Sequence, residues 1–185
     1  MRSWTGDAGL KTAMKRRIYL LRHGKSSWGG SAREDKDRDL NPRGRKAAEK
    51  MGEWCAENGV APDLVLCSTA TRTRETLARL LPRLKSAARI EFEDALYLAD
   101  AHELTARLRR LGGATRAVMV IRHNPGLHEL ACLLAGDGEA EDLARLNGKF
   151  PTAALAELSA ELKTWRELAP HRCILDRFVL PRELP

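Results

Sequence analysis

Residues 117–125 read Ala-Val-Met-Val-Ile-Arg-His-Asn-Pro: five apolar residues, then a polar pair, then an Asn-Pro pair that is typical of a helix start. A short apolar run between such boundaries predicts a strand that is buried on both faces. Residues 18–24, Ile-Tyr-Leu-Leu-Arg-His-Gly, repeat this order of an apolar run followed by Arg-His. We therefore expect buried strands over 117–121 and 18–21, each followed by an arginine and a histidine.

Strands and helices alternate on both sides of these two segments. Further apolar runs predict strands over residues 64–67, 89–92, 153–158 and 174–180, with a polar loop after Gly136. Apolar residues at helical spacing predict helices that begin at Asn41-Pro42, at Ser68 as the N-cap, at Asp100 and at Asn124-Pro125. Such alternation is typical of an α/β fold, a three-layer sandwich whose mainly parallel central sheet has helices on both faces.

The reactive residues fall at one predicted edge of this sheet. Ligands of parallel sheets bind beyond the carboxyl ends of the strands, where Arg22, His23, Arg72 and His123 are all expected. Burying an arginine without an anionic partner costs much free energy, and guanidinium groups match phosphate oxygens in bidentate fashion. The sequence therefore predicts a phosphate pocket at this edge.

Composition limits the class of protein. The chain has 185 residues, with 43% hydrophobic and 31% charged residues, which indicates a globular domain rather than a disordered chain. No apolar run approaches the ~18–20 residues of a membrane helix. The aromatic content of 5% argues against a nucleic-acid binder that stacks bases. We expect neither a membrane nor a nucleic acid as partner.

The net charge of +7 is concentrated at the amino terminus, where residues 1–17 hold five basic residues and one acidic residue. We expect a disordered or artefactual extension over residues 1–15, with an organelle-targeting peptide as the alternative, and a single domain over residues 16–185. The four cysteines lie far apart without a Cys-x-x-Cys pair, so neither a zinc site nor a disulfide framework is expected. Reduced thiols favour a cytoplasmic protein.

Four segments resemble the histidine phosphatase (phosphoglycerate mutase-like) superfamily. Residues 20–28, Leu-Leu-Arg-His-Gly-Lys-Ser-Ser-Trp, are similar to its Arg-His-Gly signature in the form found in the SixA-type phosphohistidine phosphatase branch. Residues 39–44 resemble the L-x-x-x-G helix start, residues 68–76 the S-x-x-x-R-x-x-x-T segment, and residues 121–127 the G-H-N-P-G-L segment. The resemblance extends from about Arg16 to the end of the chain.

The resemblance implies an enzyme, a metal-independent histidine phosphatase without a cofactor. It implies that His23 is the nucleophile that becomes phosphorylated. Arg22 and Arg72 would hold the transferring phosphoryl group, and His123 would donate to an equatorial oxygen. These roles match what phosphoryl transfer requires, namely in-line positioning and neutralisation of charge.

Other segments are expected near the pocket. Asn124 is a further candidate for substrate binding, and Ser26 either adds a hydroxyl contact to the phosphate or packs the loop. Residues 149–152, Lys-Phe-Pro-Thr, resemble a stretch of the same branch and either line the pocket or form a turn before a strand. The mixed charges of residues 33–38 indicate a solvated loop near the pocket mouth, where a protein substrate would be read.

Two departures from the family pattern bear on function. Arg122 replaces the glycine before the second histidine, and its side chain either enlarges the phosphate pocket or points outward. The carboxylic acid that protonates an alkoxide leaving group has no clean match, because Glu93 and Asp94 are both more typical of surface charges. A phosphorylated imidazole needs no such acid.

These observations predict a phosphatase that acts through a phosphohistidine intermediate and hydrolyses phosphohistidine on a signalling protein. Two alternatives stay open: a phosphomonoesterase or mutase that acts on a small phosphate ester, and a non-catalytic phosphate-binding module.

Overall fold

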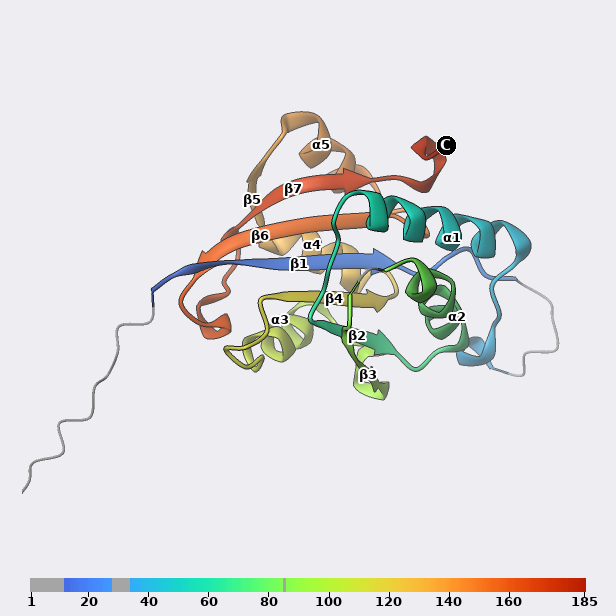
Figure 1. Ribbon diagram of the computed structural model, residues 1–185, viewed down its shortest axis with the longest axis horizontal. Helices are drawn as coiled ribbons and strands as arrows, with labels where there is room; N and C mark the ends of the chain where they lie inside the picture. Colours follow the sequence, from blue (N-terminus) through green and yellow to red (C-terminus); the bar gives the residue numbers. More distant parts are fainter. Residues whose placement is uncertain (1–11, 28–33, 85) are drawn as a thin grey trace, which may run out of the picture.

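The computed structural model describes residues 12–27, 34–84 and 86–185 and contains one sheet of seven strands in the order β3-β2-β4-β1-β6-β7-β5 (Figure 1). The strands are β1 (Met14–Arg22), β2 (Leu64–Ser68), β3 (Arg89–Glu93), β4 (Ala117–Arg122), β5 (Ala135–Gly138), β6 (Leu155–Leu162) and β7 (Cys173–Val179). The pairs β1–β4, β2–β4, β2–β3 and β5–β7 are parallel, and β6 is antiparallel to both β1 and β7. The predicted α/β class with a mainly parallel sheet is confirmed.

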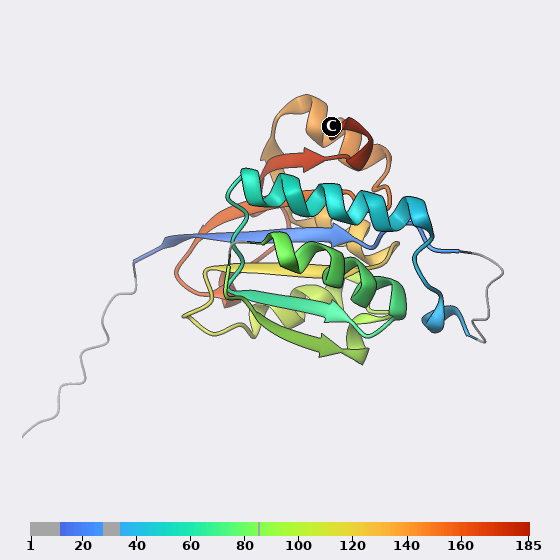
Figure 2. The same cartoon turned by 45° about the vertical axis from the view of Figure 1, so that its right-hand side comes forward.

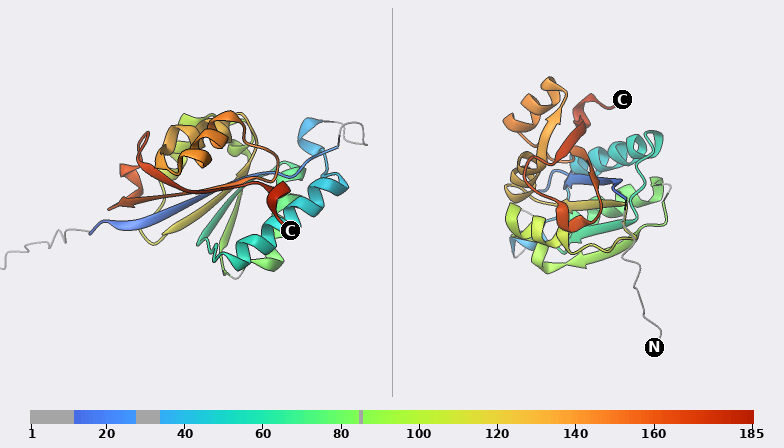
Figure 3. Two further views of the ribbon diagram at one scale, coloured as in Figure 1. Left: turned by 90° about the horizontal axis from the view of Figure 1, so that it is seen from above. Right: turned by 90° about the vertical axis from the view of Figure 1, so that its left-hand side faces the viewer.

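Helices cover both faces of the sheet (Figures 2 and 3). They are α1 (Pro42–Glu57) and α2 (Thr71–Leu80) on one face, and α3 (Ala101–Arg109), α4 (Gly126–Leu134) and α5 (Ala140–Gly148) on the other. Side chains alternate along a strand, so Tyr19 and Leu21 of β1 pack toward α1 and α2. Ile18 and Leu20 join the core under the other three helices. The central strand β1 is thus buried on both faces, as its apolar run predicts.

Two helix starts follow their predicted caps. The Asn41 side chain accepts a hydrogen bond from the Gly44 amide at 2.8 Å, and Pro42 occupies the first turn of α1. Asp100 accepts from two amides at the start of α3 and forms a capping box with Glu103. The prediction that Ser68 caps the second helix is wrong, because β2 continues through Ser68 and α2 begins only at Thr71.

β1 begins earlier than expected. Met14 and Lys15 pair with Leu162 and Glu161 of β6, so these two residues of the expected extension belong to the sheet. Buried Arg16 donates to the carbonyls of Thr115 and Lys163 and lies 5.4 Å from the Trp165 ring centroid. Three consecutive basic residues, Lys15 to Arg17, precede Ile18, and a search for apolar runs overlooks such a segment. Residues 1–11 of the expected extension lie outside the described part of the chain.

The stretch after Gly136 is more regular than the expected polar loop. It contains the end of β5 and the whole of α5. Leu146 is the only fully buried residue of α5, and β5 has the composition Ala-Gly-Asp-Gly. β5 carries too few apolar residues to give a pattern, and α5 is a short helix of nine residues that buries little apolar surface.

The remaining global predictions concern thiols, metals and membranes. All four cysteines are free, and burial raises the pKa of Cys55, Cys67 and Cys173 to about 12. Among the described residues, no group of three His, Cys, Asp or Glu side chains is placed to hold a metal ion. In that same part of the chain, no helix has the length and apolar character needed to cross a membrane.

Candidate active site

The two histidines of the sequence motifs meet at the carboxyl edge of the central strands. β1 and β4 are parallel and in register, with Arg22 opposite Arg122, so His23 and His123 follow side by side. Their ring centroids are 4.9 Å apart, and the two side chains are 7% and 6% exposed. The His23 amide donates to the Arg122 carbonyl at 3.1 Å, which fixes the backbone where both strands end.

The glycines of two motif segments explain how the loop after His23 is held. A Cβ atom at Gly24 would lie 2.6 Å from the Gly44 carbonyl oxygen, and one at Gly44 would lie 2.1 Å from the Lys25 carbonyl oxygen. Only glycine permits such close approach of two backbones. The Gly24 amide also donates to Thr76 Oγ1 of α2 at 3.0 Å. The first turn of α1 and the middle of α2 therefore clamp the chain beside His23.

His23 presents a neutral imidazole with its lone pair on Nε2. Its Nδ1 lies 2.6 Å from the Gly24 carbonyl oxygen, and since a carbonyl can only accept, Nδ1 carries the hydrogen. Burial lowers the pKa of His23 to about 3; the Gly24 carbonyl opposes this shift, and the charges of Arg72 and Arg22 add to it. Nε2 is thereby left free for nucleophilic attack.

His123 is also neutral, in the opposite tautomer. Arg72 Nε donates to His123 Nδ1 at 3.2 Å, so Nε2 carries the hydrogen and donates to Ser68 Oγ at 3.1 Å. Burial lowers the pKa of His123 to about 2, helped by His23 and Arg72. Ser68 is a site residue that the sequence analysis assigned to a helix cap; its place at the start of the S-x-x-x-R segment is the signal that points to the site.

Arg72 is paired with a carboxylate of the same chain, that of Asp35. Its Nη2 donates to Asp35 Oδ2 at 2.8 Å and its Nη1 to the Asp35 carbonyl at 2.5 Å. Tyr97 OH donates to the same Oδ2 at 2.6 Å, and Arg38 Nη1 donates to Oδ1 at 2.7 Å. These contacts, that of Tyr97 first, hold the pKa of Asp35 well below its usual range. Asp35 belongs to the mixed-charge segment expected at the pocket mouth.

The other predicted binding residues lie around this group. Arg22 Nη1 and Asn124 Nδ2 both donate to the Phe150 carbonyl, at 2.7 and 3.1 Å. The peptide bond between Asn124 and Pro125 is cis. Ser26 Oγ accepts from Arg38 Nη2 at 2.7 Å, so its hydroxyl supports the arginine that holds Asp35.

Arg122 neither enlarges the pocket nor points outward. The side chain is 2% exposed, and its Nε and Nη2 donate to the carbonyls of Leu96 and Tyr97 at 3.0 and 3.5 Å. Burial lowers its pKa to about 10. Arg122 thus ties the end of β4 to the segment that presents Tyr97, whose ring meets His123 edge-on at 5.3 Å between centroids. Tyr97 was not predicted as a site residue, because this contact joins segments 26 residues apart.

The two candidate acids are engaged elsewhere. Glu93 accepts from Arg107 of α3 at 2.6 and 3.0 Å. Asp94 is exposed and accepts from Lys36 at 2.5 Å and from the Thr69 hydroxyl. The Lys36 hydrogen bond is the main cause that lowers the pKa of Asp94. A carboxylate that stays ionised has no proton to donate to a leaving group.

The chain is similar to proteins of a known family. The model of the histidine phosphatase superfamily (branch 1) matches residues 18–100. An uncharacterized protein of Mycobacterium tuberculosis is 35% identical over 164 residues, which span 88% of this chain and 100% of that protein. An uncharacterized chloroplastic protein of Arabidopsis thaliana is 30% identical over 169 residues, 86% of this chain and 73% of that protein.

Two solved structures named putative phosphohistidine phosphatase SixA are also similar. The one from Nakamurella multipartitia has a TM-score of 0.79 and 30% identity, over 92% of this chain and 98% of its own. The one from Agrobacterium tumefaciens has a TM-score of 0.74 and 30% identity, over 90% of this chain and 98% of its own.

Proposed function

The chain belongs to the histidine phosphatase superfamily and is a phosphatase, and we propose that it hydrolyses phosphohistidine on a protein through a covalent phosphoryl group on His23. The observation that carries this proposal is the hydrogen bond between His23 Nδ1 and the Gly24 carbonyl. It leaves Nε2 as the nucleophilic atom, in a ring that burial keeps neutral.

The surrounding groups suit the transfer of a phosphoryl group. Arg72, Arg22 and His123 would hold its oxygens and neutralise the charge that develops on them. The Asp35 carboxylate binds the Arg72 guanidinium with a charge-assisted hydrogen bond of the kind that a phosphate forms. An incoming phosphoryl group would displace this carboxylate.

The reaction proceeds in two displacements. His23 Nε2 attacks phosphorus in line with the P–N bond of the substrate, and this bond breaks with its electron pair on the leaving imidazole nitrogen, which takes up a proton from solvent. Water then attacks the phosphorylated His23, which gives inorganic phosphate and restores the free histidine.

The leaving group decides between a phosphoramidate and an alkyl phosphate. An alkoxide needs a proton donor, whereas imidazole is a good leaving group near neutral pH. Glu93 is paired with Arg107, and Asp94 is held ionised by Lys36. Phosphohistidine is therefore favoured over a sugar or glycerate phosphate.

Rapid quenching during turnover of a phosphohistidine protein labelled in its phosphoryl group tests the proposal. We expect an acid-labile, alkali-stable label on the enzyme that is absent in His23→Ala and present in His102→Ala, a matched change at an exposed histidine of α3. A panel of phosphate esters is assayed alongside. An enzyme that turns over without such a label, or that prefers an ester, would refute the proposal; phosphate binding without turnover would indicate a non-catalytic module.

A further inference from the structure

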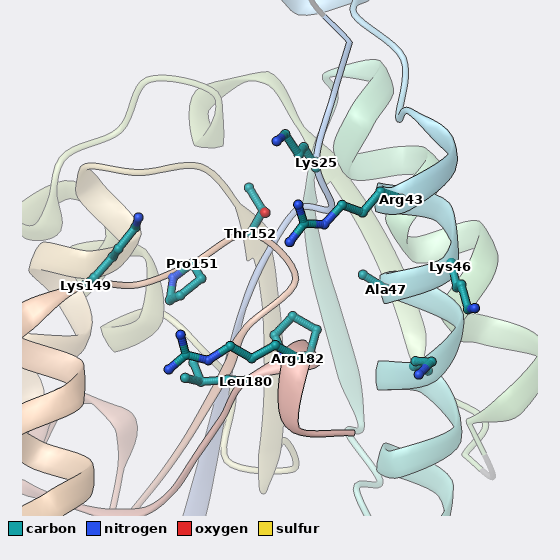
Figure 4. A pocket seen from close by; sticks show the side chains of 11 residues that line it. Lys25, Arg43, Lys46, Ala47, Lys149, Pro151, Thr152, Leu180 and Arg182 are labelled. Carbon is teal, nitrogen blue, oxygen red and sulfur yellow. The ribbon is translucent and has the colours of Figure 1, made fainter. Parts of the chain in front are cut away.

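A cavity of about 360 Å³ lies between α1 and residues 149–152 and is lined by six cationic side chains (Figure 4). It has no carboxylate in its lining. The cations are Lys25, Arg43, Lys46, Lys50, Lys149 and Arg182.

Several elements contribute to the walls. Arg43, Lys46 and Lys50 come from one face of α1, where residues three, four and seven positions apart are neighbours. Residues 149–152 form the wall opposite α1, and Arg182 comes from the short 3-10 helix Pro181–Glu183 near the carboxyl terminus (Figure 4). Lys149, Pro151 and Thr152 of the Lys-Phe-Pro-Thr stretch therefore line this cavity.

Most cations of the cavity have no carboxylate beside them in the described part of the chain, and Lys50 donates to the Leu184 carbonyl at 3.3 Å. Within the described ranges, no ion pair involves Lys25, Arg43, Lys46 or Lys149. Arg182 lies 3.7 Å from the carboxylate of Glu183 in its own turn. By contrast, the side of α1 that faces α2 pairs Glu49 and Glu53 with the arginines Arg79 and Arg83. Like charges gathered without counter-charges repel one another, so an anion that enters the cavity is stabilised.

Two parts of the cavity lining lie close to the nucleophile along the backbone. Lys25 is two residues after His23, so their Cα atoms are at most about 7 Å apart. The Ala153 amide, directly after the 149–152 wall, donates to the carbonyls of Arg22 and His23 at 3.0 Å. A ligand with several anionic groups can therefore place one at His23 and the others in the cavity.

We propose that this site also removes the terminal phosphoryl group from a short phosphoanhydride chain, whose remaining phosphates bind in the cationic cavity. A volume of about 360 Å³ is in the range of small-molecule sites, and arginine and lysine are the side chains that bind phosphate. The missing acid agrees with this substrate class, because a phosphate leaving group has a second pKa near ~6 and departs without protonation.

The transfer balances with water as the only other reactant. His23 Nε2 attacks the terminal phosphorus, the P–O anhydride bond breaks, and the shortened chain leaves with the electron pair on the former bridging oxygen. Water then hydrolyses the phosphorylated His23 to inorganic phosphate, with release of a proton. This step rests on the proposed function for its nucleophile.

Tripolyphosphate is the probe. Phosphate release from tripolyphosphate and from a phosphohistidine protein is measured for the wild type and for the variant Lys46→Ala/Lys50→Ala/Arg182→Ala. We expect the ratio of the two kcat/KM values, tripolyphosphate over phosphohistidine protein, to fall at least about tenfold in this variant. The control Arg110→Ala/Arg116→Ala/Lys163→Ala removes the same charge near the opposite edge of the sheet and should leave the ratio unchanged.

Three results would overturn this inference. The first is no turnover of tripolyphosphate by an enzyme that is active on the phosphohistidine protein, and the second is an unchanged ratio of kcat/KM values in the cavity variant. The third is stronger inhibition of phosphohistidine turnover by a hexa-aspartate peptide than by tripolyphosphate. The last result would assign the cavity to an acidic protein surface. A fully active His23→Ala enzyme would instead refute the proposed function itself, so the two failures are distinguishable.

Discussion

Lowering the pH from 7.5 to 5 should reduce the free energy of unfolding by about 4 kcal/mol through His23 and His123 alone. Both rings are buried, and their pKa values in the folded protein are about 3 and 2. In the unfolded chain each titrates near ~6.5. Between these values the unfolded state binds a proton that the folded state does not, so stability falls as the pH falls.

The size of this loss in free energy of unfolding is set by the pKa of histidine in the unfolded chain. Each histidine contributes about 1.4 kcal/mol per pH unit below ~6.5, which gives about 2 kcal/mol per ring at pH 5. Because both folded values lie well below pH 5, this loss is insensitive to their precise positions. Carboxyl groups of the unfolded chain titrate near ~4 and contribute little in this window.

Urea unfolding at the two pH values measures the effect. The wild type should lose about 4 kcal/mol more than the double variant His23→Asn/His123→Asn, and each single variant should remove about half of the difference. The other histidines are common to all four proteins and cancel. Equal losses in the wild type and the double variant would refute the assignment of two neutral rings, and with it the lone pair that the mechanism requires on His23 Nε2.

Three further outcomes are expected. Asp35→Asn removes the carboxylate charge that is paired with Arg72, so the binding of inorganic phosphate, measured by calorimetry, should tighten about twofold to fivefold. Weaker phosphate binding would contradict the displacement of Asp35. Glu93→Gln and Asp94→Asn should each leave phosphohistidine turnover within about threefold, whereas a loss of ~10²-fold would restore a carboxylic acid mechanism. Gly126→Ala places a Cβ atom 2.3 Å from a neighbouring carbonyl oxygen and should lower stability in urea by about 1–3 kcal/mol. Gly112→Ala, with nothing within 4 Å, is its control, and equal stability of the two variants would contradict the packing.

The fold could be predicted where apolar runs and caps are strong. The 18–21 and 117–121 runs lie in strands buried on both faces, and Asn41 and Asp100 cap their helices with local hydrogen bonds. The first residues of β1 could not be predicted in the same way. Arg16 is buried there because it finds carbonyl partners 99 and 147 residues away in sequence, which no local pattern reveals.

The candidate site shows the same division. That His23 and His123 lie together follows from two parallel strands that end at one edge, a rule of topology that needs no contact information. The positions of Asp35, Tyr97 and Arg122 depend instead on contacts between distant segments. A sequence shows that a guanidinium needs a partner, but it does not show whether a carboxylate, a carbonyl or a ligand will supply it.

The ladder between β1 and β4 has a consequence for how activity is lost. The two strands are paired along six consecutive residues at the middle of the sheet, and the rings stand one residue beyond the last pair. No hinge or loop separates them, so the histidines come apart only when the most protected backbone of the molecule opens. On heating, the protection of the amides of residues 18–21 from exchange and the catalytic activity should therefore be lost at the same temperature, in one cooperative transition.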